Sequence, residues 1–135
     1  MSERSRITVT GGCHCGDVRY HARLDVPVQA HACNCSVCQA TGFVGVIIPA
    51  ADFTLDTSRE ALSEYRFNTG VARHWFCARC GVKSFYRPRS NPDGISLNLH
   101  CLALAADTDV EIIEFDGRNW ERNAASLVHL SRKRG

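Results

Sequence analysis

The sequence predicts a mainly β fold, built largely from antiparallel strands, with one or two short helices. Three observations predict it: short runs rich in β-branched and alternating apolar residues fill most of the chain, turn signals separate these runs, and helical periodicity is scarce. A length of 135 residues is typical of one globular domain. We therefore expect residues 1–135 to form a single domain.

Roughly seven to nine strands are expected from the apolar runs and the Gly, Pro and Asp residues that bound them. The run at 43–48 is continuously apolar, which is typical of a strand that is buried on both faces. The run at 95–99 alternates apolar and polar residues instead. The predicted strands are 7–10, 18–24, 28–32, 43–48, 62–67, 74–77, 82–86 and 95–99.

Two segments outside the strands carry weak helical signals, and a third predicts a turn. Residues 51–53 open a turn after Pro49, and residues 101–106 are good helix formers in a segment too short to be stable alone. The segment 89–94 contains Pro, Asp and Gly, which supply backbone geometry that a strand does not use.

Composition excludes several classes of function. Sixteen basic and 14 acidic residues give a formal charge of +2, which is too small for a nucleic-acid-binding polycation, and the cluster Arg132, Lys133 and Arg134 is typical of a solvated terminus. No run approaches the roughly 18 apolar residues of a membrane span, and residues 1–10 lack a secretory signal. We therefore expect a cytoplasmic protein without a membrane or nucleic-acid partner.

Eight cysteines are more than a reduced cytoplasmic protein of this size needs for folding, so they predict metal ligands before disulfides. Seven of them form three tight groups, whose spacing of one or two residues lets thiolates converge on one ion at about 2.3 Å each. We call these groups the first pair (Cys13 and Cys15), the triplet (Cys33, Cys35 and Cys38) and the last pair (Cys77 and Cys80).

The residues after each group suggest how the ligands divide. Gly16 follows the first pair and Gly81 follows the last pair, whereas Gln39 follows the triplet. A tight metal-binding turn closes readily on a glycine at positive φ. We therefore join the two pairs into a closed structural zinc site and assign the triplet to a second zinc ion with an open fourth position, which distinguishes a catalytic zinc from a structural one.

An open three-thiolate zinc site carries a net charge of −1 and suits binding of an exogenous thiol. Two readings stay open at this point. In the first, the chain is an enzyme that acts on a small thiol. In the second, another ligand fills the site and the chain is a zinc-stabilised binding module for a protein or chromatin partner. The ligands considered for the fourth position are His31, His74, His100 and Cys101.

Addition of a thiol to a carbonyl group needs a proton acceptor for the thiol and a proton donor for the former carbonyl oxygen. His31 and His74 are weak candidates for these roles because each lies close in sequence to metal-binding cysteines, and His14 lies within the first pair. Asn34 and Ser36 lie between the ligands of the triplet, where hydrogen bonding that shapes the loop is expected.

Three arginines are weak candidates for substrate binding. Arg87 and Arg89 flank a proline after a predicted strand, and Arg73 precedes His74. Arginine binds carboxylates in a bidentate manner, so these side chains suit a substrate that carries carboxylate groups. Pairing of these arginines with local acidic residues is the alternative.

Five ordered motifs span about residues 11–121. They are GGCHCG at 11–16, CNCSVC at 33–38, FCARCG at 76–81, FYRPRS at 85–90 followed by Pro92-Asp93, and FDGRNWE at 115–121. Together they resemble the motifs of the glutathione-dependent formaldehyde-activating enzyme family, which includes the centromere protein V domain. This resemblance implies a β-tent fold, a structural zinc on the two pairs, a catalytic zinc on the triplet, and a carbon-sulfur lyase that condenses formaldehyde with glutathione to S-(hydroxymethyl)glutathione.

Overall fold

The computed structural model describes residues 5–67 and 70–131, and its strands form two sheets. The smaller sheet has three antiparallel strands in the order β1 (Ser5–Gly12), β2 (Arg19–Val26) and β5 (Phe53–Leu55). Alternate residues of β2, which are Tyr20, Ala22 and Leu24, are buried. This burial follows from the period of two that places alternate side chains on one face of a strand.

The larger sheet has seven strands, of which β3 and β10 pair in parallel and the others pair antiparallel. The strands in order are β10 (Val110–Phe115), β3 (Val28–Cys33), β4 (Val44–Pro49), β9 (Gly94–Asn98), β8 (Phe85–Arg87), β7 (Arg73–Cys77) and β6 (Leu62–Tyr65).

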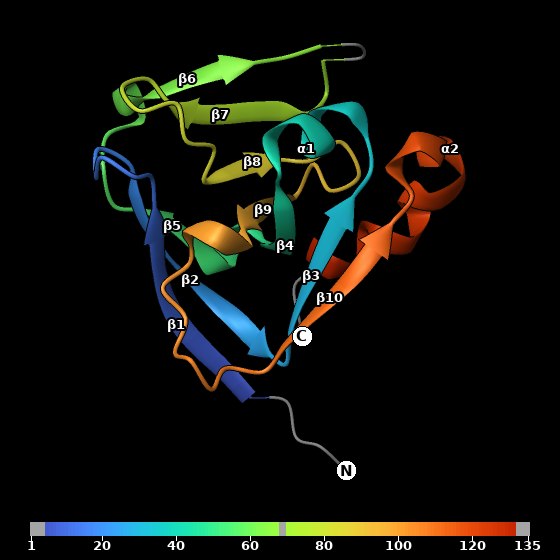
Figure 1. Ribbon diagram of the computed structural model, residues 1–135, viewed down its shortest axis with the longest axis horizontal. Coiled ribbons are helices and arrows are strands. Elements are labelled where there is room, and N and C mark those ends of the chain that lie inside the picture. Colours follow the sequence, from blue (N-terminus) through green and yellow to red (C-terminus); the bar gives the residue numbers. More distant parts are fainter. Residues whose placement is uncertain (1–4, 68–69, 132–135) are drawn as a thin grey trace.

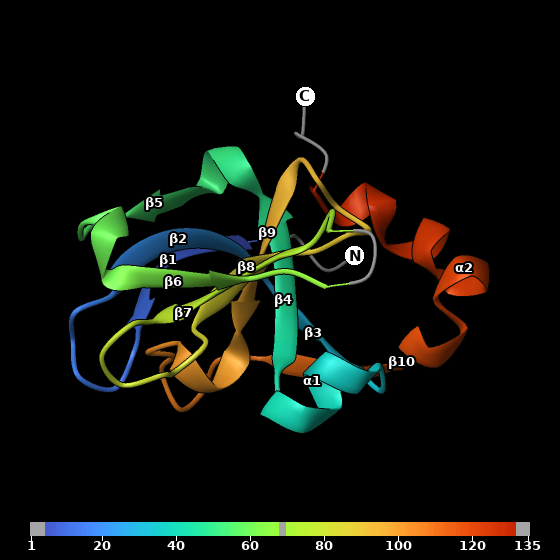
Figure 2. The ribbon, with the colours of Figure 1, turned by 90° about the horizontal axis from the view of Figure 1, so that it is seen from above.

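The two sheets diverge like the walls of a tent. In Figure 1, β1 and β2 lie on one side, β3 and β10 lie on the other, and both walls spread from the bottom of the view, with β7, β8 and β9 between them. Figure 2 shows α2 and the C-terminal turns beyond the β10 side of the molecule. The sequence-based prediction of a mainly β fold with few short helices is confirmed.

The core lies where the two sheets meet, and aromatic rings fill it. The Phe85 ring packs against Tyr20 at 5.6 Å, Phe53 at 4.7 Å and Trp75 at 5.5 Å between centroids. Edge-to-face and tilted pairs of this kind stabilise a core beyond the area that they bury. Because Phe85 belongs to the larger sheet and Tyr20 to the smaller one, this cluster fixes the angle between the walls.

Two α-helices and five 3-10 segments accompany the strands in the described part of the chain, and three of these seven elements follow the last strand. The helix α1 (Ser36–Thr41) joins β3 to β4 and ends at Gly42, whose φ of 68° is left-handed. The C-terminal segment, residues 116–131, is helical from Gly117 to Ser131 and covers one end of the larger sheet. The 3-10 segments are Ala50–Asp52, Arg59–Ala61, Leu99–Cys101, Gly117–Asn119 and Ala124–Ser131, and the second α-helix is α2 (Trp120–Asn123).

The predicted strands correspond to observed ones, with differences at their ends and two omissions. The run at 82–86 contributes a strand only from Phe85, because the preceding residues complete the turn after Cys80. The strands β5 and β10 are not predicted from the sequence. The segment 101–106 forms no α-helix, and its first residue ends a 3-10 turn.

No helix in residues 5–67 or 70–131 is both long and apolar enough to cross a membrane. The basic cluster Arg132, Lys133 and Arg134 lies outside the described residues.

Candidate metal centres and the cleft beside them

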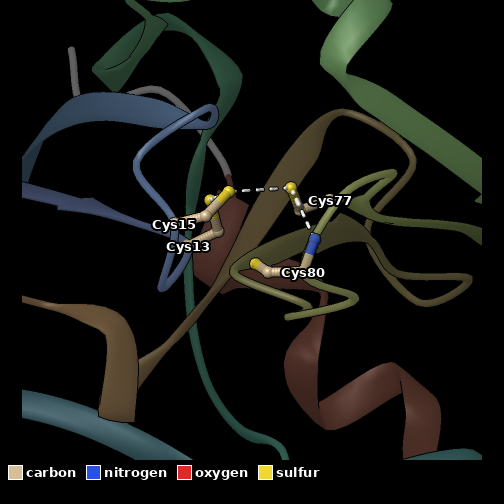
Figure 3. A group of neighbouring side chains, drawn as sticks. All are labelled: Cys13, Cys15, Cys77 and Cys80. Carbon is tan, nitrogen blue, oxygen red and sulfur yellow. Dashed lines mark hydrogen bonds between the residues drawn. The ribbon is translucent and has the colours of Figure 1, made fainter.

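The structure brings the first and last cysteine pairs together across the two sheets. Their four sulfur atoms lie within 4.8 Å of one another, and we call this group the four-cysteine cluster. The Sγ atom of Cys15 lies 3.6 Å from that of Cys13 and 3.6 Å from that of Cys77. Figure 3 shows the first pair on one loop facing Cys77 and Cys80 on another.

Backbone amides point at the sulfur atoms of the four-cysteine cluster. The N–H of Val18 donates to Cys13 Sγ at 3.3 Å, and the N–H groups of Arg79 and Cys80 donate to Cys77 Sγ at 3.4 Å. Hydrogen bonds of this kind favour a thiolate over a thiol. At Cys80, backbone donation from Cys15, followed by that from Val82, lowers the pKa to about 6.

Glycines close both turns of the four-cysteine cluster, as the sequence predicted. Gly16 has a φ of 92° and Gly81 a φ of 78°, which are left-handed conformations that favour glycine. The N–H of Gly81 donates to the carbonyl of Cys77 at 2.9 Å, and the N–H of Cys77 donates to the carbonyl of Val82 at 3.0 Å. Each turn is therefore tight enough to present two sulfur atoms to one point.

The triplet forms a second group, the three-cysteine cluster, in which the sulfur atoms of Cys33, Cys35 and Cys38 lie within 4.8 Å of one another. Cys33 ends β3, Cys35 is the residue before α1, and Cys38 lies in the first turn of that helix. Hydrogen bonds from the thiols of Cys33 and Cys38 lower the pKa of Cys35. One short segment thus supplies all three sulfur atoms.

The donor chemistry of both clusters fits zinc. All eight cysteines are free thiols, and the sulfur separations of 3.6 Å in the four-cysteine cluster far exceed a disulfide bond of about 2.05 Å. Sulfur atoms bound at about 2.3 Å to one tetrahedral ion stand about 3.8 Å apart. Among the described residues, no other His, Cys, Asp or Glu joins the three-cysteine cluster, and this includes His31, His74, His100 and Cys101.

The C-terminal segment holds the loop of the three-cysteine cluster. Asn34 donates from Nδ2 to Asp116 Oδ1 at 3.0 Å and accepts at Oδ1 from the N–H of Arg118 at 2.9 Å. Arg118 also donates to the carbonyl of Asn34 and to the side chain of Gln39. Gly117 lies so close to Cys33 that a β-carbon at this position would collide with the Cys33 sulfur.

A cleft of about 520 Å³ opens beside the three-cysteine cluster. All three cysteines line it, together with residues from β3, β7, β8 and the C-terminal segment. Its polar lining residues include Ser90, Ser96, Arg89, Arg118 and Glu121, and its apolar lining residues include Phe43, Phe67 and Trp120. The cleft is large enough for a small-molecule substrate.

Both candidate histidines line the cleft and are held neutral at neutral pH. Burial lowers the pKa of His31, and burial together with the Lys83 ammonium lowers the pKa of His74 to about 4. Nδ1 of His31 and Nε2 of His74 are buried and have no hydrogen-bond partner in the described structure. These two atoms are therefore available to a group that enters the site.

Of the three candidate arginines, only Arg89 lines the cleft. Its guanidinium lies 3.5 Å above the Trp120 ring and forms an ion pair with Glu121. Arg73, at the start of β7, lies opposite Arg87, at the end of β8, in the register of the two strands. The guanidinium of Arg87 lies 5.9 Å from the centroid of the Trp75 ring. The structure does not bring these two arginines into the cleft.

Sequence reasoning missed three residues that surround the three-cysteine cluster. Arg118 lines the cleft from the C-terminal segment, and Tyr86 lines it from β8. Burial raises the pKa of Tyr86 well above its usual range, and Cys38 contributes to this shift. The third is Lys83, which lies buried next to His74 and Tyr86. Its signal in the sequence is a lone lysine within the segment 82–86, which is predicted to be a strand.

Comparison with known proteins gives the same identification as the motifs. Residues 8–114 match the model of the glutathione-dependent formaldehyde-activating enzyme family. The structure is also similar to a crystal structure of a Rhodobacter sphaeroides protein, with a TM-score of 0.67 and 32% sequence identity, over 73% of this chain and 91% of that chain. The chain therefore belongs to the glutathione-dependent formaldehyde-activating enzyme family.

Proposed function

We propose that this protein is a zinc-dependent enzyme of the carbon-sulfur lyase type, which joins or splits a small thiol such as glutathione and an aldehyde. One observation carries the proposal: the three-cysteine cluster lines a cleft of about 520 Å³, and no fourth protein ligand joins it among the described residues. The alternative of a zinc-stabilised binding module for a protein or chromatin partner expects a fourth ligand at this site. Family membership favours the enzyme.

The ligand assignments of the proposal follow the geometry of the two clusters. Cys33, Cys35 and Cys38 would hold a zinc ion that binds the substrate thiol as a thiolate and lowers the pKa of that thiol. The four-cysteine cluster would hold a second, structural zinc ion and stabilise the junction of the two sheets.

The proposed reaction conserves atoms and electrons without an oxidant or reductant. In the joining direction, the thiol loses its proton and its sulfur forms a bond with the aldehyde carbon. The π electrons of the carbonyl move to the oxygen, which takes up a proton to give a hemithioacetal. The buried Nε2 of His74 and Nδ1 of His31 border the cleft, and we place them near this oxygen as hydrogen-bonding groups.

Substrate carboxylates would bind the arginines that line the cleft. Arg89 and Arg118 line it and present guanidinium groups, whereas Arg73 and Arg87 lie outside the cleft lining and are second choices. Each guanidinium already has a partner, Glu121 for Arg89 and Gln39 for Arg118, which would have to be shared with the substrate. Eight free thiols suit a reducing compartment, so we place the protein in the cytoplasm.

Exchange spectroscopy by NMR tests the proposed function. A zinc-replete sample is mixed with ¹³C-labelled formaldehyde and glutathione, and the rate of exchange between aldehyde hydrate and hemithioacetal is measured. We expect the protein to accelerate exchange, and we expect Cys38→Ser to abolish the acceleration. Cys101→Ser is the matched control, because Cys101 belongs to neither cluster. A zinc-replete protein that accelerates exchange with none of several small thiols and aldehydes would contradict the proposal.

A further inference from the structure

Lys83 is a buried cation without an acidic partner. Its exposed fraction is 9%, and no carboxylate in the described structure forms an ion pair with it. Lysine is almost never buried to this extent unless an anion compensates its charge. Lys83 and Lys133 are also the only lysines of the sequence, and the other 14 of its 16 Lys and Arg residues are arginines. A compact ammonium at this position therefore needs an explanation.

The ammonium of Lys83 is held in place on several sides. Its Nζ lies 2.7 Å from His74 Nδ1, 4.0 Å from the centroid of the Tyr86 ring and 4.9 Å from that of Phe43. The backbone carbonyl of Lys83 accepts a hydrogen bond from Asn98 Nδ2 at 3.0 Å. Because an ammonium has only donors, His74 Nδ1 accepts and the proton of the neutral imidazole resides on Nε2.

The side chains that contact the Lys83 ammonium line the same cleft as the three-cysteine cluster. Burial lowers the pKa of Lys83 to about 8, and the charges of Cys38 and Cys35 oppose this shift. Tyr86, whose ring lies under the ammonium, also interacts with Cys38. His74, Tyr86, Phe43 and the cysteines all line the cleft, so the cation lies directly behind the cleft wall.

The charge of the site explains why a cation belongs there. Three thiolates and one zinc ion sum to −1, and a substrate thiolate would bring the total to −2 in a partly buried site. Such a charge is costly away from water unless a cation offsets it. A neutral ligand at the same position would leave the total at −1 and would have less need of the cation.

We propose that Lys83 is the buried counter-charge of the three-cysteine cluster, and that it makes the cleft select ligands that add a negative charge there over neutral ligands. The inference rests on the proposed function, in which the added charge is the thiolate of the substrate. Lys83 is accordingly a positioning residue that acts through the electrostatic potential of the site. His74 and Tyr86 hold its ammonium against the cleft wall.

Ligand binding to the cobalt-substituted protein tests this inference without an activity assay. The visible absorption of the cobalt ions is titrated with 2-mercaptoethanol, which has no carboxylate, and with imidazole as the neutral ligand. We expect Lys83→Met to weaken thiol binding by at least about tenfold and to leave imidazole binding nearly unchanged. Lys83→Arg, which keeps the charge, should retain the ratio of the two affinities. Arg79→Met is the matched control, since it removes a cation whose side chain is 73% exposed.

Each outcome of the titration is informative. If the unsubstituted chain binds the thiol and Lys83→Met binds it equally well, Lys83 is not the counter-charge, although the proposed function survives. Equal weakening of thiol and imidazole binding means that Lys83 only supports the structure, which also overturns the inference. If the unsubstituted chain binds no thiol at all, the proposed function itself fails. If Lys83→Met loses cobalt from the three-cysteine cluster, Lys83→Arg decides instead. An unchanged ratio of thiol affinity to imidazole affinity in Lys83→Arg supports the inference, and a lowered ratio contradicts it.

Discussion

The four-cysteine cluster and the three-cysteine cluster use the same ligand type in opposite architectural settings. The first joins a loop of the smaller sheet to a turn of the larger sheet, more than sixty residues apart in sequence, whereas the second draws its sulfur atoms from one short segment between β3 and α1. The first lies against the core and the second lines the cleft. The comparison teaches that chain connectivity, rather than ligand type, places one cluster between the two sheets and the other in the cleft.

The largest expected effect comes from breaking the four-cysteine cluster. Cys80→Ser removes a ligand that connects the two sheets, and structural zinc binding is coupled to folding by roughly 10 kcal/mol or more. We expect this variant to lose the cooperative unfolding transition. Circular dichroism during thermal unfolding, with metal analysis of the purified protein, checks the expectation. A folded variant that keeps a normal transition would show that this cluster does not stabilise the fold.

The same substitution in the three-cysteine cluster should have a different result. Cys38→Ser removes a ligand from a single segment, so we expect one zinc ion to be lost and the fold to remain. Metal analysis should return two zinc ions for the unsubstituted chain and one for the variant, while the far-ultraviolet spectrum stays the same. Equal damage from Cys38→Ser and Cys80→Ser would abolish the distinction between the clusters, as would a stoichiometry of one in the unsubstituted chain.

A substitution outside the ligands sharpens the comparison. Gly117→Ala places a β-carbon against the Cys33 sulfur, so we expect metal affinity at the three-cysteine cluster to fall by about 10- to 100-fold, with the four-cysteine cluster unaffected. Competition with a chelator measures both affinities.

Gly42→Ala is the matched control for this substitution, because it meets no neighbour within 4 Å but strains a φ of 68°. It should cost about 1 kcal/mol of stability and leave both affinities unchanged. Equal effects of the two substitutions on the affinity of the three-cysteine cluster would contradict the steric explanation.

The smallest effect concerns pH. The pKa of His74 is lowered by burial and by Lys83 to about 4, so the unfolded chain binds a proton at this residue between about pH 6.5 and pH 4 and the folded chain does not. The free energy of unfolding therefore decreases as the pH is lowered through this window. Between pH 7.5 and pH 5.5, the free energy of unfolding of His74→Gln should decrease by about 1 kcal/mol less than that of the unsubstituted chain. Denaturant unfolding at pH 7.5 and pH 5.5 measures it, and parallel losses in both proteins would contradict the assignment.

Much of the fold was predictable because its local signals agree with its tertiary structure. The glycines at 16 and 81 predicted left-handed turns, and the structure has them. The continuous apolar run at 43–48 predicted a strand covered on both faces, and β4 lies within the larger sheet with every residue buried or half-buried. Turn chemistry and apolar runs are local properties, so single-sequence reasoning reaches them.

The features that escaped prediction depend on contacts between distant segments. The strand β10 has exposed residues along much of its length, and its parallel partner β3 lies about eighty residues earlier. Asn34 was expected to shape its loop, but its partners Asp116 and Arg118 could not be identified from sequence. Lys83 was recognisable as a lone lysine in an apolar segment, but its contact with His74 depends on the pairing of strands and has no spacing signal in the sequence.

The hydrogen bonds between Asn34 and the segment 115–118 also affect the order in which the molecule can be completed during synthesis. Translation delivers the ligands of the four-cysteine cluster once residue 80 has emerged from the ribosome. The loop of the three-cysteine cluster emerges earlier but waits for its C-terminal support. A nascent chain therefore has all the ligands of the four-cysteine cluster before the loop of the three-cysteine cluster reaches its final shape.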